Sequence, residues 1–265
     1  MSVPIAVTIA GSDSGAGAGI QADLKTFSAL EVYGASVITA LTAQNTGGVF
    51  AIHDVPADFV ATQINAVFTD FDVSAVKIGM TNNAPVIEAI AAALDRFRPR
   101  HVVLDPVMAA SSGELLLRQD ALRALRDLIS RVHVLTPNLP EAAALLGASP
   151  ARDENEMLAQ GQKLLTLGAA AVLVKGGHGD GPESVDFLVE ADKYLRLAAP
   201  RLQTRETHGT GCTLSSAIAA GLAKGLPLET AAAEAKAYVS AAIAAAGRLG
   251  VGRGRTPLHH FHAWW

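Results

Sequence analysis

The chain has 265 residues, 50% of them hydrophobic and only 5% aromatic, and its formal net charge is −4. This length suits one large α/β domain, and the aliphatic composition argues against an aromatic-rich β-sandwich. The negative charge excludes a basic field for nucleic acid, and the single cysteine excludes an internal disulfide framework. Because an uncharged apolar stretch of about 18 residues is also missing, we expect a soluble cytoplasmic protein that does not bind membranes.

Residues 5–9 form an apolar, β-rich run that predicts a first strand buried on both faces. A glycine-rich loop at 11–19 and an amphipathic helix at about 20–30 follow it. This order resembles a dinucleotide-binding unit, but the spacing of Gly15, Gly17 and Gly19 differs from G-x-G-x-x-G, and the expected acidic residue is missing. We expect the loop either to approach a small ligand closely or to be a flexible turn.

The next predicted strands end at residues that suit a ligand site. Strand 35–43 leads to Gln44, strand 73–78 leads to Gly79 and Met80, and strand 101–104 leads to Asp105. Open α/β sheets bind ligands beyond the carboxyl ends of their strands, where a carboxylate suits Mg²⁺ or a polar substrate. Taken alone, Gln44 is also consistent with an ordinary loop amide. The helices predicted between these strands span residues 56–68 and 84–97.

The second half repeats this pattern. A predicted helix at 115–129 and a strand at 132–135 lead to Asn138 and Glu141, which are three residues apart at a helix start. Both side chains can face one site, although an ordinary N-cap explains Asn138 equally well. After a helix at 154–167 and a strand at 170–174, Lys175 precedes two glycines and can neutralise a phosphate.

Residues 185–189 and 194–197 alternate loosely and predict a hairpin at an antiparallel edge. An apolar run at 214–222 and an alanine-rich helix at 228–247 complete the chain's regular elements. At least five strand–helix units predict a doubly wound sheet with one ligand edge. Since no linker or repeat divides the chain, we expect a single domain over residues 1–265.

The stretch 207–213, Thr-His-Gly-Thr-Gly-Cys-Thr, combines three features. Gly209 and Gly211 allow a tight turn whose N–H groups converge on one point. Thr213 lies where a helix should begin, and a helix N-terminus attracts anions. Cys212 lies at this start, where a thiolate is favoured. An anion site and a base thus coincide, as phosphoryl transfer to a hydroxyl requires; the alternative is a glycine turn that caps a packed helix.

The C-terminal tail, residues 250–265, carries two arginines, three histidines and two tryptophans. The imidazoles of His259, His260 and His262 allow a metal cluster, but no acid or cysteine completes it. Packing of the tail on the body or on a partner subunit is the favoured alternative.

Seven motifs in order resemble those of the ribokinase-like superfamily, and within it the bacterial hydroxymethylpyrimidine/phosphomethylpyrimidine kinases of thiamine biosynthesis. They cover nearly the whole chain, from the first strand to the last helices. The matching stretches are residues 10–15 with 19–25, 42–46, 77–80 (Lys-Ile-Gly-Met), 105–108 (Asp-Pro-Val-Met), 136–142, 174–178 and 207–213.

The resemblance implies a three-layer α/β/α sandwich with a mostly parallel sheet, helices on both faces and a small antiparallel edge hairpin. It also implies ATP and Mg²⁺ as cofactors and a homodimer. The expected reaction is phosphorylation of 4-amino-5-hydroxymethyl-2-methylpyrimidine, followed by phosphorylation of the monophosphate to the diphosphate. The alternatives are a pyridoxal kinase of the same superfamily and, more distantly, a non-catalytic ligand-binding protein.

Roles carried over from the resemblance fall into three groups. Cys212 resembles the family's proposed base, and Gly209, Thr210 and Gly211 would form an anion hole for the transferring phosphoryl group. At the cofactor, Lys175, Thr213 and Asn138 would contact the nucleotide, while Glu141 and Asp105 would hold the metal region, with Mg²⁺ bound partly through water. The pyrimidine-binding residues implied are Gln44, Gly11, Asp23, Met80 and Val107.

Two of these expectations also rest on side-chain chemistry. The amide of Gln44 offers an acceptor beside a donor, which complements the exocyclic amine and adjacent ring nitrogen of the pyrimidine. Met80 and Val107 would sandwich the ring through apolar contact. Asp23, by contrast, could equally be a helix residue paired with Lys25 or another neighbour.

Overall fold

The computed structural model of the protein describes residues 3–110, 113–118, 120–177, 181–202 and 208–265. The strands within these residues are β1 (Ile5–Asp13), β2 (Tyr33–Asn45), β3 (Gly48–Asp54), β4 (Ala75–Ile78), β5 (Val102–Leu104), β6 (Val134–Leu135), β7 (Ala171–Lys175), β8 (Glu183–Val189) and β9 (Tyr194–Pro200). They form one sheet in the order β3-β2-β1-β4-β5-β6-β7-β8-β9. The pairs from β2–β1 to β6–β7 are parallel, whereas β3, β8 and β9 pair antiparallel at the two edges.

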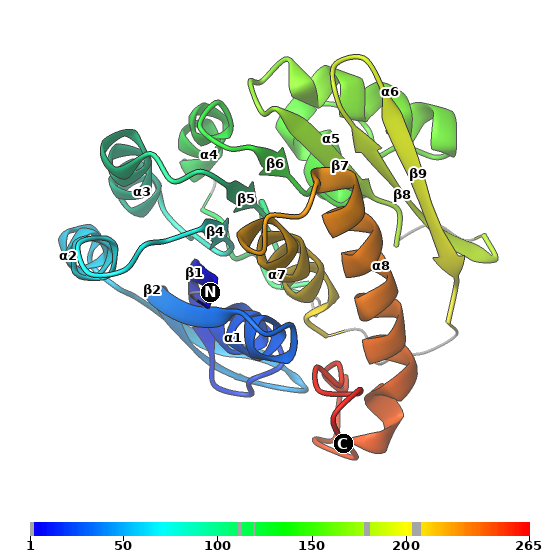
Figure 1. Ribbon diagram of the computed structural model, residues 1–265, viewed down its shortest axis with the longest axis horizontal. Coiled ribbons are helices and arrows are strands. Elements are labelled where there is room, and N and C mark those ends of the chain that lie inside the picture. Colours follow the sequence, from blue (N-terminus) through cyan, green and yellow to red (C-terminus); the bar gives the residue numbers. More distant parts are fainter. Residues whose placement is uncertain (1–2, 111–112, 119, 178–180, 203–207) are drawn as a thin grey trace.

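Helices cover both faces of the sheet (Figure 1). On one face lie α2 (Ala57–Phe68), α3 (Ala84–Phe97), α4 (Ala121–Ile129), α5 (Leu139–Leu146) and α6 (Glu154–Leu165); on the other lie α1 (Gly19–Ala29), α7 (Thr210–Ala223) and α8 (Leu228–Ala245). This three-layer α/β/α sandwich with its antiparallel edge hairpin confirms the expected fold class. Among the described residues, no helix combines the length and apolar character needed to cross a membrane.

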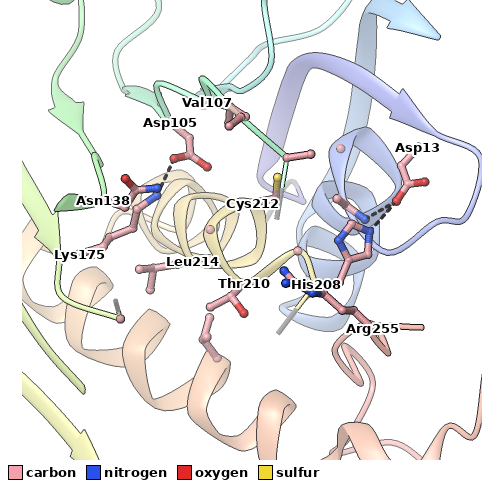
Figure 2. A pocket seen from close by; sticks show the side chains of 18 of the residues that line it. Asp13, Asp105, Val107, Asn138, Lys175, His208, Thr210, Cys212, Leu214 and Arg255 are labelled. Carbon is pink, nitrogen blue, oxygen red and sulfur yellow. Dashed lines mark hydrogen bonds and ion pairs between the residues drawn. The ribbon is translucent and has the colours of Figure 1, made fainter. Parts of the chain in front are cut away.

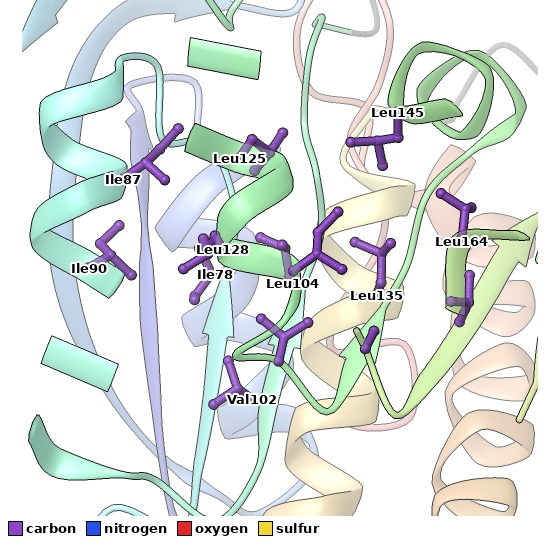
Figure 3. Close-up of a cluster of buried hydrophobic side chains, with 14 of the residues drawn as sticks. Ile78, Ile87, Ile90, Val102, Leu104, Leu125, Leu128, Leu135, Leu145 and Leu164 are labelled. Atoms are coloured by element: carbon purple, nitrogen blue, oxygen red, sulfur yellow. The ribbon is translucent and has the colours of Figure 1, made fainter. Parts of the chain in front are cut away.

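Alternating side chains of the buried strands fill two separate cores. Ile78 of β4 and Leu104 of β5 join the larger core, where they pack with helices α3 and α4 (Figure 3). Ala75 of β4 and Val103 of β5 face the opposite side and join the core beneath α1, α7 and α8. Because successive residues of a strand point to opposite faces, a strand covered by helices on both sides is mainly apolar on both faces. This requirement explains the short continuous apolar runs of the sequence.

Two elements differ from the sequence-based expectations. Strand β3 was not expected: it forms a hairpin with β2 at the sheet edge, and its middle is exposed, with Phe50 72% accessible. A strand without a buried face carries little periodic signal. The helix expected from residue 115 begins only at Ala121, because residues 113–118 form a loop. Leu116 of this loop is buried in a small cluster with Met80 and Ala40.

Candidate active site

A cavity of about 1470 Å³ lies at the carboxyl ends of the parallel strands. The chain passes from β1 to β2 on one side of β1 and later to β4 on its other side, so the strand order reverses at β1. Such a switch point is where open α/β sheets form a ligand crevice. The cavity is lined by twelve of the fourteen residues expected at the site: Gly11, Gln44, Met80, Asp105, Val107, Asn138, Glu141, Lys175, Gly209, Thr210, Gly211 and Cys212.

A buried lysine and two carboxylates form the charged end of the cavity (Figure 2). Nζ of Lys175 lies 2.7 Å from Oδ1 of Asp105 and 3.9 Å from Oε2 of Glu141. Burial alone would lower the pKa of Lys175, but these carboxylates raise it, so the ammonium is charged at neutral pH. A positive charge between two oxygen-rich groups can bind a phosphate together with a divalent cation.

Asn138 and Glu141 fix each other at the start of α5. The side chain of Asn138 accepts the N–H of Glu141 at 2.9 Å, and the Glu141 carboxylate accepts the N–H of Asn138 at 2.8 Å, which is a capping box. The N-cap interpretation of this pair is therefore confirmed, and both side chains also line the cavity. Burial raises the pKa of Glu141 to about 7, although the Lys175 ammonium opposes the shift.

The glycine turn places the start of α7 against the charged end of the cavity. Gly209, the N-cap, has φ = 86°, and a Cβ there would lie 2.0 Å from the carbonyl oxygen of Gly17. A Cβ on Gly211 would lie 3.3 Å from Nζ of Lys175 and 3.4 Å from Oδ2 of Asp105. Glycines thus allow the helix start to approach both the first loop and the ion pair. The first N–H groups of a helix have no intrahelical acceptor and attract anions.

Cys212 lies in the first turn of α7, and Figure 2 shows it between the Lys175–Asp105 pair and the Asp13–His208 pair. Burial raises the pKa of its thiol to about 11; the Lys77 ammonium lowers this value, and the carboxylates of Asp23 and Asp105 add to it. In the ligand-free protein, burial therefore opposes the thiolate that the helix start was expected to favour.

The other end of the cavity is apolar, with an amide at its edge. Met80, which is buried, and Val107 belong to one small cluster, and a Cβ on Gly11 would lie 2.9 Å from Sδ of Met80. Gln44 is the penultimate residue of β2. It pairs with Val49, which packs against this cluster, and it lines the cavity. The apolar surface can hold a flat ring, while the amide can read its polar edge.

The side chains of Asp13 and His208, at this end of the cavity, had no role in the sequence-based hypothesis. Nε2 of His208 lies 3.1 Å from Oδ2 of Asp13 and 3.3 Å from the Gln44 amide. Asp13 ends β1 and also accepts backbone N–H groups of the glycine loop. An aspartate directly before a glycine-rich loop is a signal for such an N–H acceptor, but nothing in the sequence pairs it with a histidine 195 positions away.

Asp23 and Thr213 do not line the cavity, and their expected roles are corrected. The carboxylate of Asp23 is fully buried and lies 2.9 Å from Nζ of Lys77. It faces the core beneath α7, so it is a structural residue paired with a neighbour. Thr213 is also fully buried, and its Oγ1 lies 3.0 Å from Nε2 of His260 in the tail. Since α7 begins at Thr210, Thr213 is already one turn inside the helix.

The C-terminal tail packs on the body, as favoured above. Leu258 joins the core beneath α7 and α8, and the hydroxyl of Tyr238 donates to the carbonyl oxygen of His260. Burial lowers the pKa of His260 to about 3, so its ring is neutral. Within the described part of the chain, no three His, Cys, Asp or Glu side chains are grouped to hold a metal. His178 and Thr207 of the family motifs lie outside the described residues.

Known proteins share both the sequence and the fold. A sequence model of the family described as Phosphomethylpyrimidine kinase matches residues 13–259. A hydroxymethylpyrimidine/phosphomethylpyrimidine kinase of Rhizobium meliloti (strain 1021) is 60% identical over 262 residues, which cover 98% of each chain. A crystal structure of phosphomethylpyrimidine kinase from Clostridium difficile 630 has a TM-score of 0.81 at 44% identity, covering 91% of this chain and 100% of that chain. The ADP complex of Bacillus subtilis pyridoxal kinase has a TM-score of 0.90 at 33% identity, covering 99% of both chains. The chain belongs to the phosphomethylpyrimidine kinase family.

Proposed function

We propose that the protein transfers a phosphoryl group from ATP to the hydroxymethyl group of 4-amino-5-hydroxymethyl-2-methylpyrimidine, and then to the resulting monophosphate. One observation carries this proposal: a single cavity joins an anion-binding helix start, beside Lys175, to an apolar wall edged by the amide of Gln44. The 60% identity to a relative with this name supports the same acceptor.

The phosphates belong at the charged end. Lys175 supplies a fixed positive charge, and Gly209, Thr210 and Gly211 present the start of α7 to the charge that develops on the transferring group. The cavity continues along α8, where Val239 offers apolar surface to the nucleotide base. Because the groups already stand in place, little reorganisation is needed during transfer.

Asp105 and Glu141 fit a magnesium site. Both carboxylates line the cavity beside Lys175, and Mg²⁺ prefers a small number of carboxylate oxygens completed by water and phosphate. Bound Mg²⁺ would neutralise negative charge on the transferring phosphoryl group. Asn138 orients Glu141 through the capping box, and its backbone N–H holds the carboxylate on the cavity side.

Cys212 is the residue that we place beside the substrate hydroxyl. A thiol with a pKa of about 11 is protonated at neutral pH, so it does not deprotonate the hydroxyl in advance. A loose phosphoryl-transfer transition state needs little base, because the hydroxyl becomes acidic only late in the transfer. We therefore assign Cys212 to orienting the hydroxyl through a hydrogen bond. The hydroxyl proton leaves late in the transfer, to an oxygen of the transferring phosphoryl group or to water.

The second candidate is a pyridoxal kinase, favoured by the TM-score of 0.90 to an enzyme of that name. We would measure product formation from ATP and Mg²⁺ with three acceptors: the hydroxymethylpyrimidine, its monophosphate and pyridoxal, with Cys212→Ala as a control. Conversion of the monophosphate, with poor use of pyridoxal, is the expected result. Pyridoxal as the best acceptor would overturn the substrate assignment, and no turnover of any acceptor would overturn the kinase.

The wider organisation is also proposed. The single sheet of β1–β9 supports one kinase domain over residues 1–265, and we place this domain in the cytoplasm. The exposed Phe50 and Ile52 of the edge strand β3 offer an apolar surface for a homodimer. Sedimentation of the wild type and of Phe50→Ser tests this surface, since a variant that sediments like the wild type would exclude Phe50 from the contact.

A further inference from the structure

Asp13, His208 and Gln44 form a hydrogen-bonded row at the substrate end of the cavity. Nε2 of His208 lies 3.1 Å from Oδ2 of Asp13, and the amide nitrogen Nε2 of Gln44 lies 3.3 Å from the same ring nitrogen. Figure 2 shows the first of these contacts on the side of the cavity opposite Lys175. Asp13 is 3% exposed and His208 is 9% exposed, so water competes little for either group.

Asp13 can only accept hydrogen bonds. Its Oδ1 accepts the N–H of Gly15 at 2.8 Å, and its Oδ2 accepts those of Gly17 at 3.0 Å and Ala18 at 2.9 Å. Burial alone would raise the pKa of Asp13, but these donors and His208 hold it below its ordinary value. An ionised carboxylate has no hydrogen to give, so Nε2 of His208 must carry the hydrogen that this contact requires.

A donor at Nε2 decides how the neighbouring amide lies. The two orientations of a glutamine amide fill the same space, so hydrogen-bond partners must distinguish them. The structure places the amide nitrogen of Gln44 toward His208, which sets N–H against N–H, so the hydrogen bonds favour the amide turned by 180°. On its other flank the structure places Oε1 of Gln44 3.1 Å from Oγ1 of Thr42, but the single hydrogen of this hydroxyl has a second acceptor in the carbonyl oxygen of Ser12 at 3.0 Å. Thr42 is then free to accept, and a donor suits that flank.

We propose that His208 is a positioning residue. Its single Nε2 hydrogen is shared between Oδ2 of Asp13 and the Gln44 amide, which turns the amide oxygen toward His208 and leaves the amide nitrogen toward Thr42. With the oxygen held by His208 and the nitrogen by Thr42, the edge of the amide that faces the substrate has one remaining lone pair on the oxygen and one remaining N–H on the nitrogen. Their order along this edge is therefore fixed. This order accepts a ring with an amine beside an unprotonated nitrogen. A ring with a carbonyl beside an N–H would meet donor with donor and acceptor with acceptor, and is rejected. The inference deepens the proposed function and rests on it for the identity of the ring.

The kinetic test compares the hydroxymethylpyrimidine with its 4-oxo analogue, in which the amine and ring nitrogen are replaced by a carbonyl and an N–H. We would measure the ratio of kcat/KM for the two acceptors in the wild type, His208→Leu and His208→Gln. The ratio cancels any general loss of phosphoryl transfer caused by the nearby glycine turn. We expect it to fall about tenfold in His208→Leu, which removes the hydrogen-bond donor. In His208→Gln it should stay within about threefold, since that amide nitrogen can donate from the position of Nε2.

An unchanged ratio in His208→Leu, or an equal loss in both variants, would overturn the positioning role. Neutron diffraction from deuterium-exchanged crystals of the wild type reads the orientation without any substitution. Deuterons on the Gln44 atom nearer Thr42 are expected, and deuterons on the atom nearer His208 would refute the inference. A wild type that phosphorylates neither acceptor would refute the proposed function, while the neutron result would still decide the orientation.

Discussion

Cys212 is the single cysteine of the chain, so thiol chemistry on the whole protein reports its protonation alone. Burial raises its pKa to about 11. Compared with an ordinary cysteine of pKa about 8.5, the thiolate fraction at neutral pH is lower by about 300-fold. A more basic thiolate is also more nucleophilic, and a Brønsted coefficient of about 0.4–0.5 restores roughly tenfold. Cys212 should therefore exchange with a disulfide reagent about 30-fold more slowly than a free cysteine at neutral pH.

The assay is the reaction of the ligand-free protein with an aromatic disulfide, followed by absorbance across the pH range in which the protein stays folded, with glutathione as the reference thiol. The logarithm of the rate should rise linearly with pH and show no plateau up to about pH 9, because the thiol is still mostly protonated there. The shape of this profile does not depend on how easily the reagent enters the cavity. A plateau near neutral pH would refute the reasoning, since it would mean that the start of α7 and the Lys77 ammonium outweigh burial.

Three further substitutions test the buried charges and the glycine turn. Lys77→Met leaves the carboxylate of Asp23 buried without its cation, which should cost about 3–5 kcal/mol and lower the melting temperature by roughly 10 °C. An unchanged melting temperature would contradict the pair. For Glu141→Gln, burial raises the wild-type pKa to about 7, so ionisation of this group destabilises the wild-type fold progressively as pH rises from its unfolded value to about 7. Above pH 7 the free energy of unfolding of the variant should therefore be about 1–3 kcal/mol higher than that of the wild type, and in acid the two values should converge. The variant should also lose turnover. A difference in stability that does not depend on pH would argue against this cause. Gly209→Ala places a Cβ against the carbonyl oxygen of Gly17 at φ = 86°, and it should lower the free energy of unfolding by at least about 2 kcal/mol and remove most activity. The control Gly225→Ala has a similar φ of 83° but open space around its Cβ, so it should keep activity. Equal activity of the two variants would exclude the close approach at Gly209.

Much of the site could be predicted because it follows from strand topology. Gln44, Asp105 and Lys175 are far apart in sequence, yet each lies at or just beyond the carboxyl end of a strand with a parallel neighbour, and these ends meet at one edge of the sheet. Periodic patterns gave no such information for β3, which has no buried face, or for residues 113–118, whose apolar side chains suit a helix as well as a loop.

Side chains whose role depends on a distant partner were harder to assign. His208 adjoins the anion-binding turn in sequence, but its ring contacts Asp13 and Gln44 at the other end of the cavity. The protonation of Cys212 is a similar case. Local sequence shows the helix start that lowers a thiol pKa, whereas the burial that raises it comes from the packing of other segments around α7.

Asp23 shows where a signal in the sequence could have corrected the hypothesis. Lys77 lies in the middle of an apolar strand whose neighbours Val76 and Ile78 face the larger core, so alternation sends the lysine to the opposite, equally buried face. A lysine there requires a carboxylate, because an unpaired buried ammonium is too costly to keep charged. Thr8 pairs in register with Lys77 on the adjacent strand and donates to Asp23 at 2.6 Å, which identifies the same face. The helix α1 that follows β1 covers this face, and Asp23 in its second turn is the acidic residue within reach, so the buried lysine predicts an ion pair for Asp23 where the resemblance suggested a ligand contact.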